Sequence, residues 1–281
     1  MGAMLRHTFC HLPGVGESTE RRLWARGLTT WDAALAAGPP RLSADRLRAS
    51  AEQYRLGNPA WFAEQLPAAH AWRLFGDFRQ RCAYLDIETT GMGPAAHVTT
   101  IALYDGRTVR TYVHGRNLAD FARDVADYSL LVTYNGKSFD LPFLARDLVC
   151  PLRQAHIDLR YVLAGLGYSG GLKGCERQLG IHRPGMEDLD GFAAVLLWYD
   201  YRRRNDRAAL ETLLAYNVQD VLNLEVLMVE AHNRKLAALA VPFAETYRLP
   251  APAVAKNPYL PDFAAVARVL RDRQRFAYRM G

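Results

Sequence analysis

The sequence has 281 residues, of which half are hydrophobic and 23% are charged, a composition typical of an ordinary globular protein with one large domain or two smaller ones. No uninterrupted apolar run is long enough to span a membrane, and the first residues lack the apolar core of a secretory signal. The four cysteines are scattered and form no CxxC pair, which favours a reducing compartment over a disulfide framework. We therefore expect a cytoplasmic protein without a membrane partner.

Charge is distributed unevenly along the chain, with a net charge of +6. Residues 1–80 carry 10 Lys/Arg and 7 Asp/Glu, residues 81–231 carry 16 and 19, and residues 232–281 carry 9 and 3. An acidic centre between basic ends is typical of a metal-binding catalytic core whose flanking segments bind a nucleic-acid backbone. Ordinary surface charge would give the same total, so the total alone does not separate the two interpretations.

Residues 1–78 are predicted to form a helical region. Within it, a Pro-Gly-Val-Gly turn lies between two helical stretches in residues 11–35 and resembles a helix-hairpin-helix motif. In that motif the glycine-rich turn lets backbone amides approach a phosphate without contacting a base. The resemblance implies that Gly14, Val15 and Gly16 bind nucleic acid. No second copy of the motif is evident, and a turn used only for protein packing is the alternative.

Residues 79–235 are predicted to form an α/β domain. Apolar and alternating patterns predict strands, and the Asp105-Gly106 turn predicts a hairpin. The expected strands are Arg81–Glu88, Val98–Tyr104, Arg107–Val113 and Leu130–Tyr134. The expected helices are Asn117–Tyr128, a segment capped by Ser138 that runs to about Val149, and Ala208–Ala238. A hairpin followed by a helical crossover predicts a mixed sheet flanked by helices.

Residues 236–281 are predicted to form a proline-rich linker (249–261) and a basic helix, Asp262–Arg279. The apolar residues of that helix are spaced as a packing stripe, and its arginines would lie on the outer face. That face could contact a nucleic-acid backbone, or it could be an ordinary solvated surface.

Four carboxylates occur in three short motifs: Asp86 and Glu88 in YLDIETTG, Asp140 at the end of TYNGKSFD, and Asp220 in AYNVQD. Strand alternation places Asp86 and Glu88 on one face. Tyr216 and Asp220 are four residues apart and share one face of a helix. Gathered carboxylates repel one another, and Mg²⁺ or Mn²⁺ offsets such repulsion with hard oxygen ligands. A solvated edge strand is the alternative for Asp86 and Glu88.

These motifs, in this order, resemble the DEDD exonucleases of the ribonuclease H-like superfamily, and the tyrosine resembles the DEDDy subgroup. The finer resemblance is to the YprB-like ribonuclease H-like proteins, and it includes the segments HIDLR (156–160) and LKGCERQLGIHRP (172–184). The resemblance covers about residues 81–231. It implies a ribonuclease H-like fold and a 3′→5′ exonuclease that uses two metal ions.

The resemblance also implies individual roles. Asp86 would bridge both metals, Glu88 and Asp220 would complete the site that activates water, and Asp140 would hold the second metal. Two ions of this kind activate the attacking water and stabilise the leaving oxygen. Tyr216 would orient or deprotonate that water, and its high ordinary pKa favours orientation. A half-buried aromatic residue with no catalytic role is the alternative for Tyr216.

Further residues near the motifs are candidate contacts to nucleic acid. Asn135 either fixes the turn after its strand or contacts the substrate. Lys137 lies inside the second motif, and Lys173 and Arg177 lie in a predicted helix after a glycine-rich loop. A solvated loop and a capped surface helix explain these residues equally well. Asp158 is interpreted as a helix cap or as a support for the metal ligands.

The sequence therefore predicts a metal-dependent nuclease that acts on single strands or 3′ ends, with DNA favoured over RNA because of the Pro-Gly-Val-Gly motif. Two other functions fit the same residues. One is a nucleic-acid-binding protein whose nuclease core is weak or inactive, and the other is a structure-specific endonuclease on the same fold. The sequence identifies no protein partner and no oligomeric state.

Overall fold

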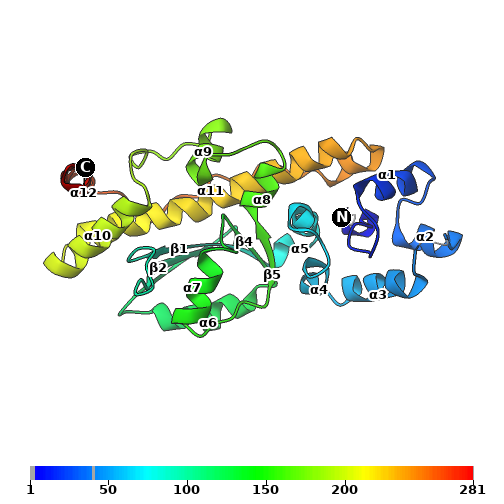
Figure 1. The fold of residues 1–281 in the computed structure, drawn as a ribbon, viewed down its shortest axis with the longest axis horizontal. Coiled ribbons are helices and arrows are strands. Elements are labelled where there is room, and N and C mark those ends of the chain that lie inside the picture. The colour runs from blue at the N-terminus through cyan, green and yellow to red at the C-terminus, as the bar shows by residue number, and fades with distance from the viewer. Residues whose placement is uncertain (1–3, 40–41, 281) are drawn as a thin grey trace.

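A computed structural model describes residues 4–39 and 42–280 of the chain, with side chains described as far as residue 273. A helical N-terminal region precedes a central sheet, and long helices complete the chain (Figure 1). The N-terminal elements are η1 (Met4–His7), α1 (Glu17–Ala25), α2 (Trp31–Ala37), α3 (Ala44–Arg55), α4 (Pro59–Ala63), η2 (Ala68–Leu74), α5 (Phe75–Phe78) and η3 (Arg79–Arg81). Among the described residues, no helix has both the length and the apolar character needed to cross a membrane.

The centre of the molecule is a mixed sheet of five strands in the order β3-β2-β1-β4-β5. β1 pairs with β2 and β2 with β3 in antiparallel fashion, whereas β1–β4 and β4–β5 are parallel. The strands are β1 (Cys82–Thr89), β2 (Val98–Tyr104), β3 (Val109–Val113), β4 (Leu130–Thr133) and β5 (Ala155–Asp158). The predicted mixed sheet with flanking helices is thus confirmed.

The two faces of the sheet are covered by different helices, so the central strands are buried on both sides and are apolar along most of their length (Figure 1). α6 and α7 pack on one face, and the long α11 crosses the other, where it contacts β1 and β2. The remaining elements are η4 (Leu118–Asp120), α6 (Phe121–Asp124), η5 (Val125–Asp127), α7 (Asp140–Asp147), α8 (Leu159–Ala164), α9 (Gly171–Gln178), α10 (Gly191–Arg204), α11 (Arg207–Leu239), η6 (Pro242–Tyr247) and α12 (Phe263–Met280).

The turn between β4 and α7 differs from the prediction. Ser138 does not cap α7, because residues 135–139 continue a tight turn in which the amides of Ser138 and Phe139 donate to the carbonyls of Asn135 and Gly136. The helix therefore begins at Asp140. Gly136 is required in this turn, since a Cβ there would lie 2.2 Å from the Thr133 hydroxyl oxygen.

The C-terminal basic helix is confirmed, and it packs against α10 and α11. Two of its arginines are paired within the protein. Arg268 binds Asp200 at 2.7 Å and also contacts Asp206, and Arg273 lies 2.8 Å from Asp190. These pairs favour docking of α12 over a free basic face.

Candidate active site

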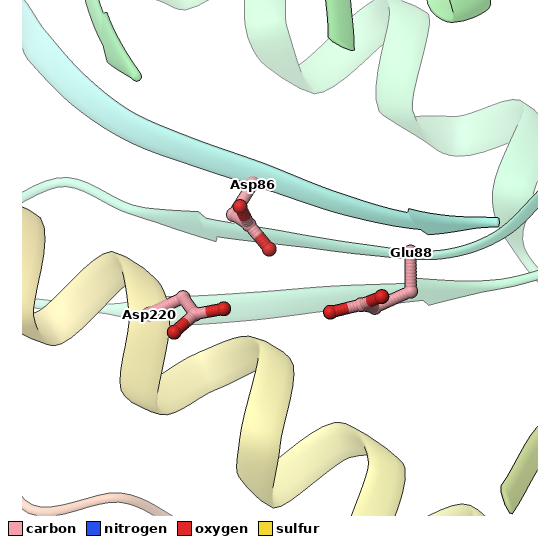
Figure 2. Close-up of side chains that lie close together, drawn as sticks. All are labelled: Asp86, Glu88 and Asp220. Carbon is pink, nitrogen blue, oxygen red and sulfur yellow. The ribbon is translucent and has the colours of Figure 1, made fainter. Parts of the chain in front are cut away.

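Three carboxylates converge where β1 meets the middle of α11. Asp86 and Glu88 extend from β1, and Asp220 extends from α11 to meet them (Figure 2). Each residue offers one oxygen, and these oxygens all lie within 4.8 Å of one another. We call Asp86, Glu88 and Asp220 the carboxylate triad.

Local structure explains why the strand residues face α11. Asp86 and Glu88 are two residues apart on β1, so both point to the same face of the sheet. The pairing of β1 with β2 shifts register between Glu88 and Thr89, and such bulges bend a strand end and re-aim its side chains. Asn217, buried on α11, donates a hydrogen bond of 2.7 Å from Nδ2 to Asp86 Oδ2 and accepts one of 3.1 Å from Thr100 Oγ1.

The negative charge of the triad is only partly compensated by neighbouring cations and hydrogen bonds. Burial raises the pKa of Asp86 and of Glu88 well above their ordinary values, and the neighbouring charges of Asp220 and Asp140 raise both further. Burial also raises the pKa of Asp220, although the Arg183 guanidinium opposes that shift. Burying like charges together is costly unless a cation offsets them.

Asp140 lies beside this group but outside it. It is the first residue of α7, is 3% exposed, and accepts a 3.2 Å hydrogen bond at Oδ1 from the Ile87 amide. Burial raises the pKa of Asp140 above its ordinary value, although backbone hydrogen bonds, including that of Ile87, oppose the shift. The structure thus brings three of the four predicted metal ligands into one tight group and places the fourth against the backbone between Asp86 and Glu88.

Tyr216 lies one helical turn before Asp220 and lines the same cleft. Burial raises the pKa of its phenol, and the carboxylates of Asp220 and Glu88 raise it further. Lys173 Nζ lies 4.8 Å from the centre of the Tyr216 ring, and that buried ammonium has no hydrogen-bond partner among the described residues. A phenol that resists ionisation is a hydrogen-bonding group rather than a base at neutral pH.

Arg183 approaches the triad from the loop between α9 and α10. It is 4% exposed, contacts Asp220 Oδ1, and binds both carboxylate oxygens of Glu176 at 2.5 Å each. Asn223 donates a 2.9 Å hydrogen bond to Glu176 Oε1. A buried Glu–Arg pair therefore lies directly against one member of the triad.

A cleft of 520 Å³ opens over these groups. Its lining includes Asp86 and Asp220 of the triad, and also Tyr216, Lys173 and Asn135. The remaining lining residues are Tyr134, Arg160, Ala164, Tyr168, Ser169, Gly170, Gly171, Leu172 and Arg183. The cleft is polar and partly basic, as a site for a phosphate backbone must be.

The turn after β4 is held by Asp158 at the edge of this cleft. Asn135 has a positive φ of 63°, and its amide donates to Asp158 Oδ1 at 2.7 Å. The amides of Lys137 and Arg160 also donate to Asp158, each at 3.1 Å. Asp158 therefore caps α8, which is one of the two roles inferred from the sequence, and Asn135 fixes the turn while lining the cleft.

The other predicted nucleic-acid contacts lie elsewhere. Lys137 and Arg177 are exposed and do not line the cleft. The turn that contains Gly14 and Gly16 is exposed and precedes α1, near the C-terminal end of α11, whereas Val15 is buried in the core (Figure 1). Gly14 has a φ of +75°, but a 3₁₀ turn, η1, takes the place of the first helix of a helix-hairpin-helix motif.

Sequence reasoning missed Asn217, Asn223, Glu176 and Arg183. Asn217 directly follows Tyr216 in the third motif, and Glu176 and Arg183 lie within the segment LKGCERQLGIHRP. An acidic and a basic residue seven positions apart across Gly180 were the available signal. Nothing local shows that both are buried, because their partner Asp220 is far along the chain.

The carboxylate triad has the donors of a divalent-metal site. Its ligands are oxygen atoms only, which suits Mg²⁺, Mn²⁺ or Ca²⁺ rather than a softer metal. Burial and the neighbouring carboxylates raise the pKa of Asp86 and of Glu88, and a bound cation would oppose both effects. The residues present therefore fit a divalent cation.

Comparisons with known proteins identify the superfamily of this chain. The sequence is 30% identical over 198 residues to "Uncharacterized protein YprB" of Bacillus subtilis (strain 168). The alignment covers 62% of this chain and 47% of that protein, so the chain spans about half the length of this relative. A family B DNA polymerase from the archaeon Pyrobaculum calidifontis aligns in structure with a TM-score of 0.42 and 18% identity, over 60% of this chain and 27% of the polymerase chain. A sequence model of the RNase H superfamily matches residues 83–232, more than half of the chain. The chain therefore belongs to the RNase H superfamily.

Proposed function

We propose that this protein is a metal-dependent 3′→5′ exonuclease that hydrolyses phosphodiester bonds, with DNA favoured over RNA as the substrate. The observation that carries the proposal is the convergence of Asp86, Glu88 and Asp220 beside a polar cleft that Asp86 and Asp220 line. Divalent ions bound in such a site activate water and stabilise the charge of the leaving oxygen. The 3′→5′ direction and the use of two ions rest on the resemblance of the three motifs to the DEDD exonucleases.

The protein's own residues would divide the work. Asp86, Glu88 and Asp220 would hold one ion, and Asp140, from its place beside them, would serve a second. The Tyr216 hydroxyl would orient the attacking water, because its raised pKa keeps the proton on the phenol.

Lys173 would contact a phosphate oxygen of the substrate. Its ammonium is buried at the cleft and lacks a hydrogen-bond partner among the described residues, and a phosphate would satisfy it. Asn135, which also lines the cleft, would contact the nucleic-acid strand. The exposed Lys137 and Arg177 and the turn of Gly14, Val15 and Gly16 would add contacts to the backbone outside the cleft.

The proposal is tested by degradation of 5′-labelled single-stranded DNA, duplex DNA and RNA with Mg²⁺, Mn²⁺ or EDTA. We expect a ladder that shortens from the 3′ end, that needs the metal, and that disappears in Asp86→Asn. Circular single-stranded DNA should stay intact, and cutting of the circle would instead show an endonuclease. Tight binding without cleavage of any substrate would contradict the proposal and favour a nucleic-acid-binding protein with an inactive site.

A further inference from the structure

Arg183 makes an unusually complete set of contacts for a loop residue. Its Nε and Nη2 donate to the two oxygens of Glu176, and its Nη1 lies against Asp220 Oδ1. Neither Nη1 nor Asp220 Oδ1 has a hydrogen-bond partner elsewhere among the described residues. The planar guanidinium thus joins two carboxylates in one fixed geometry, which the flexible point charge of a lysine would not reproduce.

This arrangement is anchored on the helix that carries Asp220. Asn223, one turn further along α11, donates to Glu176 Oε1 at 2.9 Å and accepts a 2.9 Å hydrogen bond from Gln219. The chain of contacts therefore leaves α11 at Asn223, passes through Glu176 and Arg183, and returns to α11 at Asp220. We call Asn223, Glu176 and Arg183 the Asp220 brace.

Charge neutralisation alone does not explain the brace. Glu176 and Arg183 are both buried and cancel each other, so together they add no net charge to the triad. Replacing a buried ion pair by apolar residues is often neutral or stabilising, so stability is a weak reason for such a pair. The pair instead fixes the orientation of the Asp220 carboxylate, because Arg183 is held by Glu176 and contacts one oxygen of Asp220.

This orientation of the Asp220 carboxylate is the one that the triad needs. Figure 2 shows one oxygen of Asp220 pointing toward the space between Asp86 and Glu88. Metal-binding carboxylates are commonly held by hydrogen-bonding partners behind them, and loss of such a partner typically costs 10- to 100-fold in metal affinity or activity. A free carboxylate on a helix would instead rotate among several orientations.

We propose that Arg183, held by Glu176, is a positioning residue that fixes the Asp220 carboxylate for metal binding. This inference rests on the proposed function, in which Asp220 is a metal ligand. Arg183 would act through Asp220 and would not itself contact the substrate.

The test uses two variants that keep the net charge of the brace. Arg183→Lys retains the positive charge but loses the planar fork, and the double variant Glu176→Gln with Arg183→Gln removes both charges together. Arg73→Lys is the matched control, since Arg73 forms an equally buried bidentate pair with Glu20 in the N-terminal region. Mn²⁺ binding to the metal-free, full-length protein is measured by calorimetry, and cleavage is measured at low and at saturating Mn²⁺.

We expect both brace variants to bind Mn²⁺ about 10- to 100-fold more weakly than the wild type, with no change for Arg73→Lys. Cleavage by the brace variants should be slow at low Mn²⁺ and recover at saturating Mn²⁺, while KM for the nucleic acid stays the same. A purely structural role would lower the melting temperature without raising the Mn²⁺ concentration that cleavage requires.

Unchanged Mn²⁺ affinity in both brace variants would overturn the inference, and tighter binding would do so as well by showing that Arg183 competes with the metal. If the wild type binds Mn²⁺ and cleaves, only the inference about Arg183 fails; if the wild type does neither, the proposed function fails with it. Should Arg183→Lys not fold, Asn223→Ala provides the same test by removing the hydrogen bond to Glu176 and the one from Gln219, with no change in charge. A smaller weakening of Mn²⁺ binding is expected there, and none would overturn the inference.

Discussion

Two parts of this molecule bury charged side chains, and they do so in opposite ways. In the N-terminal region, Glu20 and Arg73 are each 1% exposed and face each other, with N–O distances of 2.8 and 2.7 Å. Glu20 Oε1 also accepts hydrogen bonds from the amides of Phe9 and Cys10. Positive charge and hydrogen bonds thus meet both oxygens of this carboxylate.

At the sheet, by contrast, Asp86 and Glu88 face Asp220, and carboxylates are their main charged neighbours. The difference distinguishes a buried charge that supports the fold from one that serves function by the sign of its charged neighbours. A buried charge that meets its complement stabilises the fold, whereas buried like charges reduce stability until a ligand binds. Asp220 belongs to both classes, since it faces the triad and also contacts Arg183.

Removal of a triad charge should have the largest effect on cleavage. Asp86→Asn or Asp220→Ala should abolish metal-dependent cleavage because each removes a metal ligand. The metal-free Asp86→Asn protein should nevertheless be at least as stable as the wild type, since repulsion is also removed, whereas Asp220→Ala in addition leaves the buried Arg183 Nη1 without its partner. Asp188→Asn, which changes an exposed acid in the loop after Arg183, is the control and should leave cleavage unchanged. Unchanged cleavage in either triad variant would refute the proposed site.

The opposite result is expected for the paired charge. Glu20→Gln leaves Arg73 buried without its counter-charge and should lower the free energy of unfolding by about 3–5 kcal/mol. Asp45→Ala removes an exposed partner of Arg48 and should change it by about 0–1 kcal/mol. Both values come from denaturant unfolding. Mn²⁺ affinity of the folded Glu20→Gln protein should equal that of the wild type. A large loss of Mn²⁺ affinity would show that the Glu20–Arg73 pair is not separate from the metal site.

Stability of the metal-free protein should depend on pH through the triad. Folding raises the pKa of Asp86 and Glu88 above their ordinary values of 3.8 and 4.5, so between these values and the raised ones the folded state binds more protons than the unfolded chain. This stabilisation is fully present below about pH 4 and is lost as the pH rises through the raised values. We expect the melting temperature in EDTA to fall as the pH rises above the ordinary pKa values of these carboxyls and through the raised ones.

Two controls assign that slope to the triad. Saturating Mn²⁺ should flatten it because the metal replaces the protons, and Glu88→Gln should reduce it because one of the titrating groups is gone. A slope that is identical in the wild type and in Glu88→Gln, with and without metal, would show that other groups produce it.

Tyr216 lies at the border of the triad and should have a smaller effect. Tyr216→Phe removes only the hydroxyl and should slow cleavage by about 10- to 100-fold, with unchanged Mn²⁺ affinity, if that hydroxyl orients the water. Single-turnover rates measure this. Complete loss of activity at every pH would instead favour Tyr216 as an essential base, and full activity would remove it from the mechanism.

The smallest effect is expected in the N-terminal turn. Gly14 has a φ of +75°, which valine adopts only with strain, so Gly14→Val with Gly16→Val should distort the turn. If the turn contacts substrate, KM should rise several-fold while the single-turnover rate at saturating substrate stays the same. Unchanged KM would indicate that the turn serves packing only. Arg22→Gln, on the exposed face of α1, separates loss of charge from loss of backbone geometry.

Much of the core could be predicted from local patterns. β2 has the predicted bounds, and α11 spans Arg207–Leu239 where Ala208–Ala238 was predicted, since both are long apolar segments with clear ends. β5 was not predicted, because its four residues form a strand only through parallel pairing with β4. The helix predicted for Asn117–Tyr128 is broken into α6 and two 3₁₀ turns.

The candidate site shows the same limit. Strand alternation and helical spacing predicted that Asp86, Glu88 and Asp220 would face one another. No local rule indicates that Glu176 and Arg183 are buried against Asp220, since α9 and α11 meet only in the folded chain. Supporting residues of this kind follow from tertiary contacts and not from periodicity.

Metal binding by the carboxylate triad can be measured by titrating Mn²⁺ into the metal-free wild-type protein and into Asp86→Asn, with free Mn²⁺ followed by electron paramagnetic resonance. Saturable binding by the wild type that is lost or greatly weakened in Asp86→Asn is the predicted result. Equal binding by both proteins, or no binding by either, would show that the carboxylate triad is not a metal site.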